Sequence, residues 1–399
     1  GEAGGPYSLE APTIPQIEGL ADAAEALESS LSAILRPLLV LSRHLAALLD
    51  EKADVLESAQ RNRIEGVVRG IQRRGQEQLA AWCGMLQTLA LSPASANEDG
   101  AQEAIHDSYV DWFSIQRSDG RETDVGMHRH WIDPMLPFAG PVGNSAHGLL
   151  ITSATLSDST GADSTTKEDG AQQSVAVRTG ARHLEGTPKF DSVASPFDYA
   201  AQTKVFIVSD IEKNNIEQLA AANRELMLAS GGGALGLFTS IQRLRAVHAK
   251  LSESERFAHM QLFAQHVDGL DTGTLVDIFR AEEDACLLGT DAVRDGVDVP
   301  GRALRLICFD RVPWPRPTLL HRARKSAYEG GRYDDMITRL RLKQAFGRLV
   351  RKNTDRGVFA LLDRATPTRL LSAFPDGVEI TRCGLKNAVA ATRIFLEDH

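Results

Sequence analysis

Three polar side chains at regular spacing, Gln344, Arg348 and Arg351, are the leading candidates for chemistry in this sequence. Spacings of four and three residues predict that they share one face of a helix. The apolar residues around them fall on the opposite face and are expected to pack inward: Leu342, Phe346, Leu349 and Val350. Because arginine is always charged and binds phosphate through two parallel hydrogen bonds, this face suits a polyphosphate. The alternative is a solvated basic helix face.

The charge around these residues differs from that of the whole chain. The 399 residues carry a net charge of −9, which gives no overall attraction to nucleic acid. Residues 302–356, however, contain 15 Lys or Arg and 5 Asp or Glu, a surplus of 10 positive charges. A polyanion would therefore be attracted to this segment. It is followed by Gly357 and the apolar run 358–362, which predicts a buried strand.

Two further segments place polar residues where they could bind phosphate or lie at a sheet edge that moves. The apolar run 147–152 predicts a strand, and it ends in the hydroxyl residues Ser153 and Thr155. Residues 235–240 read as a strand and a turn, so Thr239 and Ser240 would lie at the start of the helix that follows. Hydroxyls and free N–H groups there bind phosphate, although a plain helix cap explains them equally well.

These segments resemble the conserved motifs of superfamily 2 helicases, and of the DinG/XPD-like branch in particular. Gln344-x-x-Gly-Arg348-x-x-Arg351 is similar to motif VI, and Ser153-Ala-Thr-Leu to motif III. The strand and turn at 235–240 correspond to motif IV. Residues 295–301, Asp-Gly-Val-Asp-Val-Pro-Gly, resemble motif V. The four motifs occur in the family's order, with plausible spacing, over about residues 107–365.

The copy departs from the family pattern in places. Motif V usually begins with Glu, where this chain has Asp295, and Phe-Trp usually stands where this chain has Val293-Arg294. Residues 312–315, Val-Pro-Trp-Pro, replace the common Leu-Pro-Phe-Pro. Ser195-Pro-Phe-Asp-Tyr199 also resembles the family, in which it lies at the entrance to the second motor domain.

The resemblance implies a role for each motif residue. Arg351 would be the arginine finger on the γ-phosphate, with Arg348 and Gln344 holding phosphate or relaying its state. Gly296 and Asp298 would approach the nucleotide. Ser153 and Thr155 would couple cleft closure to the DNA path, and Thr239 and Ser240 would hold the phosphates of a single strand.

A motor of this kind also needs a P-loop and an acidic pair for magnesium. The sequence contains no Gly-Lys pair and no strand that ends in Asp-Glu-x-His. We therefore expect ATP and Mg²⁺ to be cofactors of a longer parent. The four cysteines lie far apart, which predicts no metal site in this chain and leaves an iron–sulfur cluster to the upstream part. His128 and His130 would share one face of a strand without a third ligand.

The expected architecture is α/β: a RecA-like parallel-sheet motor domain 2, preceded by a helical arch-like insertion and the tail of motor domain 1. The predicted boundaries are a leader (1–14), an arch-like domain (15–95), the tail with motif III (96–156), a flexible linker (157–180) and motor domain 2 (181–399). Leucines at spacings of three and four over Leu27–Leu48 predict a bundle helix, which Pro37 should kink or split. Arg36-Pro37 interrupts the most apolar stretch, so no membrane span is predicted.

Two functions remain open. The first is the C-terminal part of an ATP-dependent DNA helicase, 5′-to-3′ by family behaviour, that acts in DNA repair or replication on single-stranded or forked DNA. The chain alone should then be inactive, and the protein a cytoplasmic monomer. The second is a non-hydrolysing module with a helicase-like fold that binds nucleic acid or a partner. A nuclease-linked relative is a weaker third reading, since no clustered carboxylates suggest a two-metal site.

Overall fold

The computed structural model describes residues 8–91, 108–118, 120–158, 167–296, 298–328 and 330–397. Contacts within the chain divide it into two compact units. The first comprises Gly1–Pro134 and Pro317–Ala327, and the second comprises Met135–Arg316 and Tyr328–His399. Each unit contains its own β-sheet, of three strands in the first and seven in the second.

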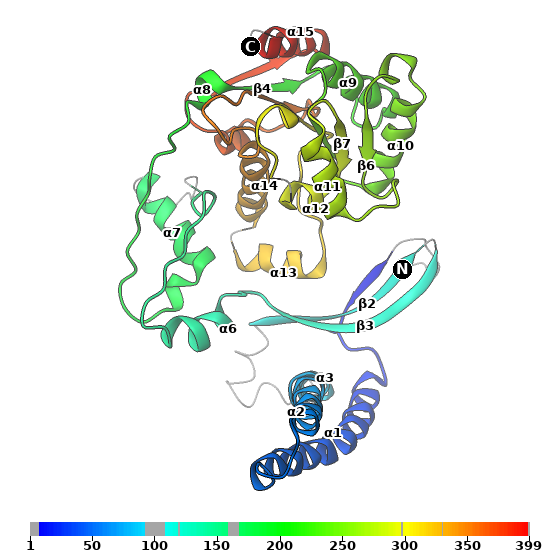
Figure 1. Cartoon of the computed structure of the whole chain (residues 1–399), viewed down its shortest axis with the longest axis vertical. Helices are drawn as coiled ribbons and strands as arrows, with labels where there is room; N and C mark the ends of the chain where they lie inside the picture. Colours follow the sequence, from blue (N-terminus) through cyan, green and yellow to red (C-terminus); the bar gives the residue numbers. More distant parts are fainter. Residues whose placement is uncertain are drawn as a thin grey trace. The chain divides into compact units, whose positions relative to one another are not determined.

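A helical bundle forms the N-terminal part of the first unit (Figure 1). α1 (Leu20–Glu51) packs against a second helical stretch made of α2 (Ser58–Ile71), the π-helical η1 (Gln72–Leu79) and α3 (Ala80–Ala90). The predicted bundle is confirmed. The helix does not split at Pro37, which lies inside α1. A proline removes one backbone hydrogen bond, and the turns on either side continue the helix.

Much of the apolar surface of α1 remains exposed. Only Ala24 and Ser42 are fully buried, whereas Leu27 and Ile34 are 50% and 54% exposed. Because α1 is uninterrupted, it is long and apolar enough to cross a membrane by length and composition alone. The expectation that Arg36-Pro37 interrupts this apolar stretch is therefore wrong. A bundle helix passes the same test, and α1 contacts α2, η1 and α3 along its length.

A three-stranded antiparallel sheet completes the first unit. Its order is β1 (Leu9–Pro12), β2 (Tyr109–Ser118) and β3 (Arg121–Trp131), and α13 (Leu319–Ala327) packs against β1 and β2. His128 and His130 lie on β3 as predicted. The His128 ring stacks on Trp112 of β2 at 5.2 Å between centroids, and the His130 ring lies 5.1 Å from Trp112 in a tilted arrangement. His128 also contacts the Ser114 hydroxyl at 2.7 Å. These histidines therefore have packing partners within the sheet.

The second unit is built on a seven-stranded sheet in which every pair of neighbours is parallel. The strand order is β10 (Glu379–Cys383), β4 (Thr203–Val208), β9 (Gly357–Leu361), β8 (Leu306–Phe309), β5 (Ala234–Leu237), β7 (Cys286–Gly289) and β6 (Leu262–Ala264). The five inner strands are short and almost wholly buried, as expected where helices cover both faces, whereas the edge strands β10 and β6 are partly exposed. The predicted α/β parallel-sheet architecture is confirmed.

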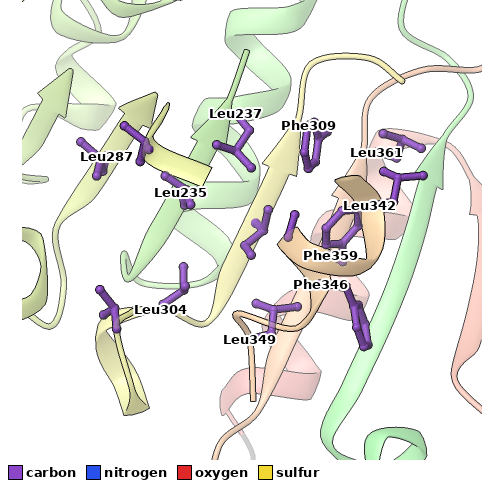
Figure 2. Close-up of a cluster of buried hydrophobic side chains, with 14 of the residues drawn as sticks. Leu235, Leu237, Leu287, Leu304, Phe309, Leu342, Phe346, Leu349, Phe359 and Leu361 are labelled. Atoms are coloured by element: carbon purple, nitrogen blue, oxygen red, sulfur yellow. The ribbon is translucent and has the colours of Figure 1, made fainter. Parts of the chain in front are cut away.

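Alternate side chains of each strand enter two different cores. Leu235, Ile307 and Phe359 point to one face, which is covered by α11 (Thr272–Ala281), α12 (Asp291–Gly296), α14 (Gly331–Phe346) and η6 (Thr368–Ala373). Cys308 and Ala360 point to the other face, which is covered by α9 (Ile216–Ala229), α10 (Ile241–Ser252) and α15 (Leu385–Glu397). Figure 2 shows the first core, where α14 lies over β8 and β9.

Short helical segments connect the remaining elements of the second unit. They are α6 (Leu136–Phe138), η2 (Ala139–Asn144), α7 (Lys167–Thr179), η3 (Ala181–His183), α8 (Tyr199–Gln202), η4 (Glu255–Phe257) and η5 (Gly301–Ala303). Of these, α7 occupies part of the segment that the sequence predicts as a flexible linker. The segment Ser92-Pro-Ala-Ser-Ala-Asn-Glu-Asp-Gly100, whose composition predicts a linker, lies outside the described residues.

The predicted strand at 147–152 is wrong, and so is the strand that the apolar run Leu275-Val-Asp-Ile-Phe279 predicts. Residues 275–279 belong to α11, in which Leu275, Val276 and Phe279 are buried at helical spacing and Asp271 caps the first turn. A short apolar run does not distinguish a strand from a helix. Residues 147–152 have no strand structure, and Leu150 is 88% exposed. A parallel strand requires neighbours in its sheet, and no described strand pairs with this segment.

Arg305 fixes the amino-terminal edge of this sheet. Its guanidinium is buried and donates to four backbone carbonyls, those of Ser230, Gly231, Glu283 and Arg302, and to the Asp284 carboxylate. The Ser230–Gly233 turn that it contacts has positive φ at Gly231, Gly232 and Gly233, the conformation that glycine adopts without strain. The glycines thus end α9, and Arg305 binds the carbonyls that the turn leaves open.

Candidate nucleotide and nucleic-acid site

The predicted helix around Gln344 ends earlier than the residue spacing suggests. α14 stops at Phe346, and the next residues form tight turns in which Arg348 N–H donates to Ala345 at 3.1 Å. Gln344 is therefore helical, Arg348 lies in the turn, and Arg351 lies in the loop before β9. The helix cannot continue because Leu349 and Val350 turn into the core, where they are 1% and 2% exposed. The predicted inward packing of Leu342, Phe346, Leu349 and Val350 is confirmed.

The loop that carries Arg351 is held by two residues that the motif comparison did not single out. The buried carboxylate of Asp355 accepts the backbone N–H groups of Arg351 and Lys352, each at 2.8 Å. Gln202, at the end of α8, donates to the carbonyls of Lys352, Asn353 and Asp355 at 3.0 to 3.1 Å. The loop geometry is therefore fixed from both sides.

The segment Ser195–Tyr199 also supports this loop. Asp198 caps α8, and the Tyr199 ring lies 5.8 Å from that of Phe346 at the end of α14. The helix that begins here supplies Gln202. A segment noticed only for its resemblance therefore has a structural role, which is to position the loop of Arg351.

Motif V and motif VI meet through one ion pair. Arg351 Nε lies 3.1 Å from Asp298 Oδ1, with 35% and 69% of the two side chains exposed. The carbonyl of Asp298 also accepts from Arg280 at 3.0 Å. Gly296 ends α12 with open space where a Cβ would lie, so local packing does not require a glycine there. Two of the predicted nucleotide-binding side chains are thus brought together, and both remain accessible.

Thr239 and Ser240 have internal partners in the structure. Ser240 caps α10 by accepting the N–H of Arg243 at 3.2 Å. Thr239 donates its N–H and its hydroxyl to Asp310, at 3.0 and 3.3 Å. Asp310 is buried and also accepts from Arg243 at 2.6 Å. Burial raises the pKa of the Asp310 carboxyl, and the Arg243 guanidinium opposes that rise. The cap interpretation of Ser240 therefore holds, and phosphate binding by the pair stays a prediction.

The two groups of residues lie at opposite edges of the sheet. Thr239 and Asp310 directly follow β5 and β8, so they lie at the carboxyl edge that parallel strands share. Asp298 and Arg351 precede β8 and β9 and belong to the amino edge. The structure therefore separates the predicted nucleotide-binding residues from the predicted strand-binding residues by the length of the strands.

The motif III segment is tied to the motif VI helix. Ser153 accepts the N–H of Thr155 at 3.2 Å, and Arg178 donates to the carbonyls of Thr155 and Leu156. Next, the carboxylate of Asp158 binds Arg339 of α14 through two hydrogen bonds of 3.0 and 2.5 Å. Both side chains of this pair are about nine-tenths buried, with 12% and 9% exposed. Nothing in the spacing of the sequence indicated this contact.

The cysteines are poor candidates for a metal or redox site. Cys286 and Cys308 are buried, and burial raises the pKa of the Cys286 thiol to about 12 and that of Cys308 further. Both therefore remain neutral thiols, whereas cluster ligands are thiolates. Among the residues that the structure describes, no three His, Cys, Asp or Glu side chains are grouped to hold a metal ion.

Comparison with known proteins agrees with this arrangement. Residues 224–379 match the family model of the helicase C-terminal domain. The ATP-dependent helicase DinG of Mycobacterium tuberculosis is 34% identical over 194 residues, which are 46% of this chain and 28% of that protein. The ATP-dependent DNA helicase YoaA of Escherichia coli is 32% identical over 180 residues, 42% of this chain and 28% of that protein. A Bacillus subtilis protein named 3′-5′ exonuclease DinG is 28% identical over 273 residues, 64% of this chain and 28% of that protein.

The fold, the motifs and these matches define a RecA-like helicase motor domain in the second unit. Residues 224–379 are similar to the helicase C-terminal domain, and the matches to DinG and YoaA support a likeness to the C-terminal part of DinG/XPD-like superfamily 2 helicases. Its matched regions span 28% of the length of each of these three relatives.

Proposed function

We propose that this chain supplies the second motor domain of an ATP-dependent DNA helicase, with Arg351 as the arginine finger at an ATP site shared with motor domain 1. The observation that carries the proposal is the contact between Arg351 and Asp298. It places a cation from motif VI beside a carboxylate from motif V, and both groups are exposed to an incoming nucleotide.

The exposure of the pair supports such a role. An ion pair of this kind contributes about 0–1 kcal/mol to stability, so Arg351 can leave Asp298 for a γ-phosphate at little cost. The backbone beneath it is held by Asp355 and Gln202. The backbone of Arg351 is thus fixed, and its ion pair with Asp298 is weak. Both properties suit a guanidinium that stabilises a transition state. Gln344 and Arg348, which precede Arg351, would contact phosphate or relay its state.

The proposal extends to the parent protein. ATP and Mg²⁺ would be its cofactors, with the P-loop, the acidic pair and any iron–sulfur cluster in the upstream part. Single-stranded or forked DNA would be the partner, held in part by Thr239 and Ser240. Movement would be 5′-to-3′, in DNA repair or replication, by a cytoplasmic monomer. Ser153 and Thr155 would report cleft closure through the contact between Asp158 and Arg339.

DNA-stimulated ATP hydrolysis by this chain and by its full-length parent tests the proposal. We expect an active parent and a silent chain, because Arg351 completes a site whose other half lies in motor domain 1. Silence of both proteins, with single-strand binding retained, would instead identify a non-hydrolysing module. Hydrolysis by this chain alone would contradict the shared site.

A further inference from the structure

A small polar cavity lies between α14, η6 and the segment that follows motif III. Its volume is about 60 Å³, and its lining includes Asp158, Arg339, Lys343 and Ser372. Arg339 and Lys343 are four residues apart, so both side chains lie on one face of α14. A cavity of this size has room for about four water-sized groups. It can therefore hold a small ligand or one end of a larger one.

Lys343 is the cation of this cavity whose charge is not satisfied. The Asp158 carboxylate forms two hydrogen bonds with Arg339, of 3.0 and 2.5 Å. The Lys343 ammonium, in contrast, has no hydrogen bond or ion pair among the residues that the structure describes. The side chain is half-buried, and burial lowers the pKa of the ammonium. A cation that loses part of its water shell without gaining an acceptor is unfavourable, so a ligand that supplies an acceptor here would be stabilised.

The charges around the cavity do not cancel. Arg339 and Lys343 line it, and Arg178 is close enough to lower the pKa of Lys343 further. The hydrogen bonds of Arg178 go to uncharged backbone carbonyls. Of the described residues in the lining, Asp158 alone carries a carboxylate. Three positive charges against one negative charge leave a surplus of two.

Neither a neighbouring carboxylate nor water removes this surplus. Asp335, one turn before Arg339 on the same face of α14, is paired with Arg369 at 2.6 Å. Water in the cavity would accept a hydrogen bond from Lys343 but would leave the charge uncompensated. A tetrahedral oxyanion supplies both the acceptors and the negative charge, and its four oxygens match the available volume.

We propose that this cavity binds an oxyanion of the size of phosphate, with Lys343 as its hydrogen-bond donor and with Arg339 and Arg178 adding positive charge. Free phosphate and the terminal phosphate of a nucleotide share this chemistry. Gln344 follows Lys343 by about 100° around the helix, so the cavity lies on a different face of α14 from Gln344. The proposal goes beyond the helicase function and does not rest on it.

Binding of inorganic phosphate to the 399-residue chain, measured by calorimetry at constant ionic strength, tests the site. Lys343→Met keeps the length of the side chain and removes its charge, so it should weaken phosphate binding about tenfold or more. Lys386→Met is the control, because Lys386 is an exposed lysine on α15, which covers the opposite face of the sheet. It should leave the affinity unchanged.

Chemical modification of the native chain gives a second measurement that does not depend on the folding of a variant. Acetic anhydride at limiting concentration reacts with neutral amines, and mass spectrometry locates the modified lysines. Phosphate in the cavity would favour the charged ammonium of Lys343. Saturating phosphate should therefore suppress acetylation of Lys343 and leave that of Lys386 unchanged.

ADP distinguishes the two sources of the anion. Competition between ADP and phosphate for protection of Lys343 identifies the terminal phosphate of a nucleotide, and phosphate protection that ADP neither reproduces nor displaces identifies free phosphate. The site is overturned if phosphate does not bind saturably, if Lys343→Met and Lys386→Met bind it equally, or if phosphate leaves the acetylation of Lys343 unchanged.

Discussion

Arg351 Nε lies 3.1 Å from Asp298 Oδ1, although Asp298 precedes β8 in the sequence and Arg351 follows it. Both side chains remain partly exposed. The pair joins the two motifs that a nucleotide would contact, yet it adds little to the stability of the fold. Activity and stability should therefore respond differently to its removal.

Arg351→Ala in the full-length parent should lower ATP hydrolysis by about 10³-fold or more, the usual effect of losing an arginine finger. The free energy of unfolding of the 399-residue chain should fall by less than about 1 kcal/mol. Steady-state hydrolysis and urea unfolding measure the two effects. Arg364→Ala, at an exposed arginine beyond β9, is the control. Full hydrolysis by a folded Arg351→Ala variant would remove Arg351 from the mechanism.

Asp355 should affect both activity and stability. Its carboxylate is buried and accepts two backbone N–H groups, so Asp355→Ala should lower the free energy of unfolding by about 3 kcal/mol. Asp355→Asn retains one acceptor oxygen and should lose less. Denaturant unfolding of both variants checks the order. Both N–H groups donate to the same oxygen, Oδ2, so equal losses would show that an uncharged acceptor oxygen does not replace the carboxylate.

Variants of Thr239 and Ser240 can change both the stability of the fold and the binding of a nucleic-acid strand, so the two effects must be measured separately. Ser240→Ala removes a helix cap and should lower the free energy of unfolding by about 1 kcal/mol. If these residues also hold strand phosphates, the double variant with Thr239→Ala should bind oligo(dT) more weakly. Asn215→Ala removes the cap of α9 and is the matched control. Equal affinities of the double variant and the control would leave only the structural role.

Arg305 should be among the most sensitive positions of the second unit. Arg305→Leu leaves four carbonyls and the Asp284 carboxylate without their donor, and should lower the free energy of unfolding by about 3–5 kcal/mol. Arg302→Leu, at a side chain 64% exposed, should cost far less. Thermal unfolding monitored by circular dichroism measures the difference, and similar losses at both positions would contradict the assignment.

The stability of the first unit should depend on pH through His130. Burial, with Arg324 and His128, lowers the pKa of His130 below its ordinary 6.5. Between the two values the unfolded chain binds more protons, so stability should rise with pH across this window and fall as the pH drops below about 6.5. Tryptophan fluorescence during urea unfolding at two pH values checks the sign. His130→Gln should reduce the dependence, and His44→Gln, at an exposed site on α1, should not.

The motif residues and most strands of the second unit could be predicted because each depends on a local pattern. Val205–Val208, Leu235–Leu237 and Val358–Leu361 are apolar runs bounded by turns, and the structure contains them as strands. The end of α14 could not be predicted, because Leu349 enters the core instead of continuing the helix. The contacts of Asp158 with Arg339 and of Gln202 with the Arg351 loop join residues more than 100 positions apart, and no spacing rule reveals them.

The parallel sheet between Arg351 and Thr239 has a mechanical consequence. Each inner strand is hydrogen-bonded to a neighbour on both sides, and the sheet is packed on both faces, so the sheet resists bending and its two edges move as one body. A displacement imposed at the amino edge, where Arg351 lies, would reach Thr239 at the carboxyl edge as a rotation of the whole unit. No hinge between the two sites is then required. The distance that Thr239 moves would depend on the angle through which the unit rotates.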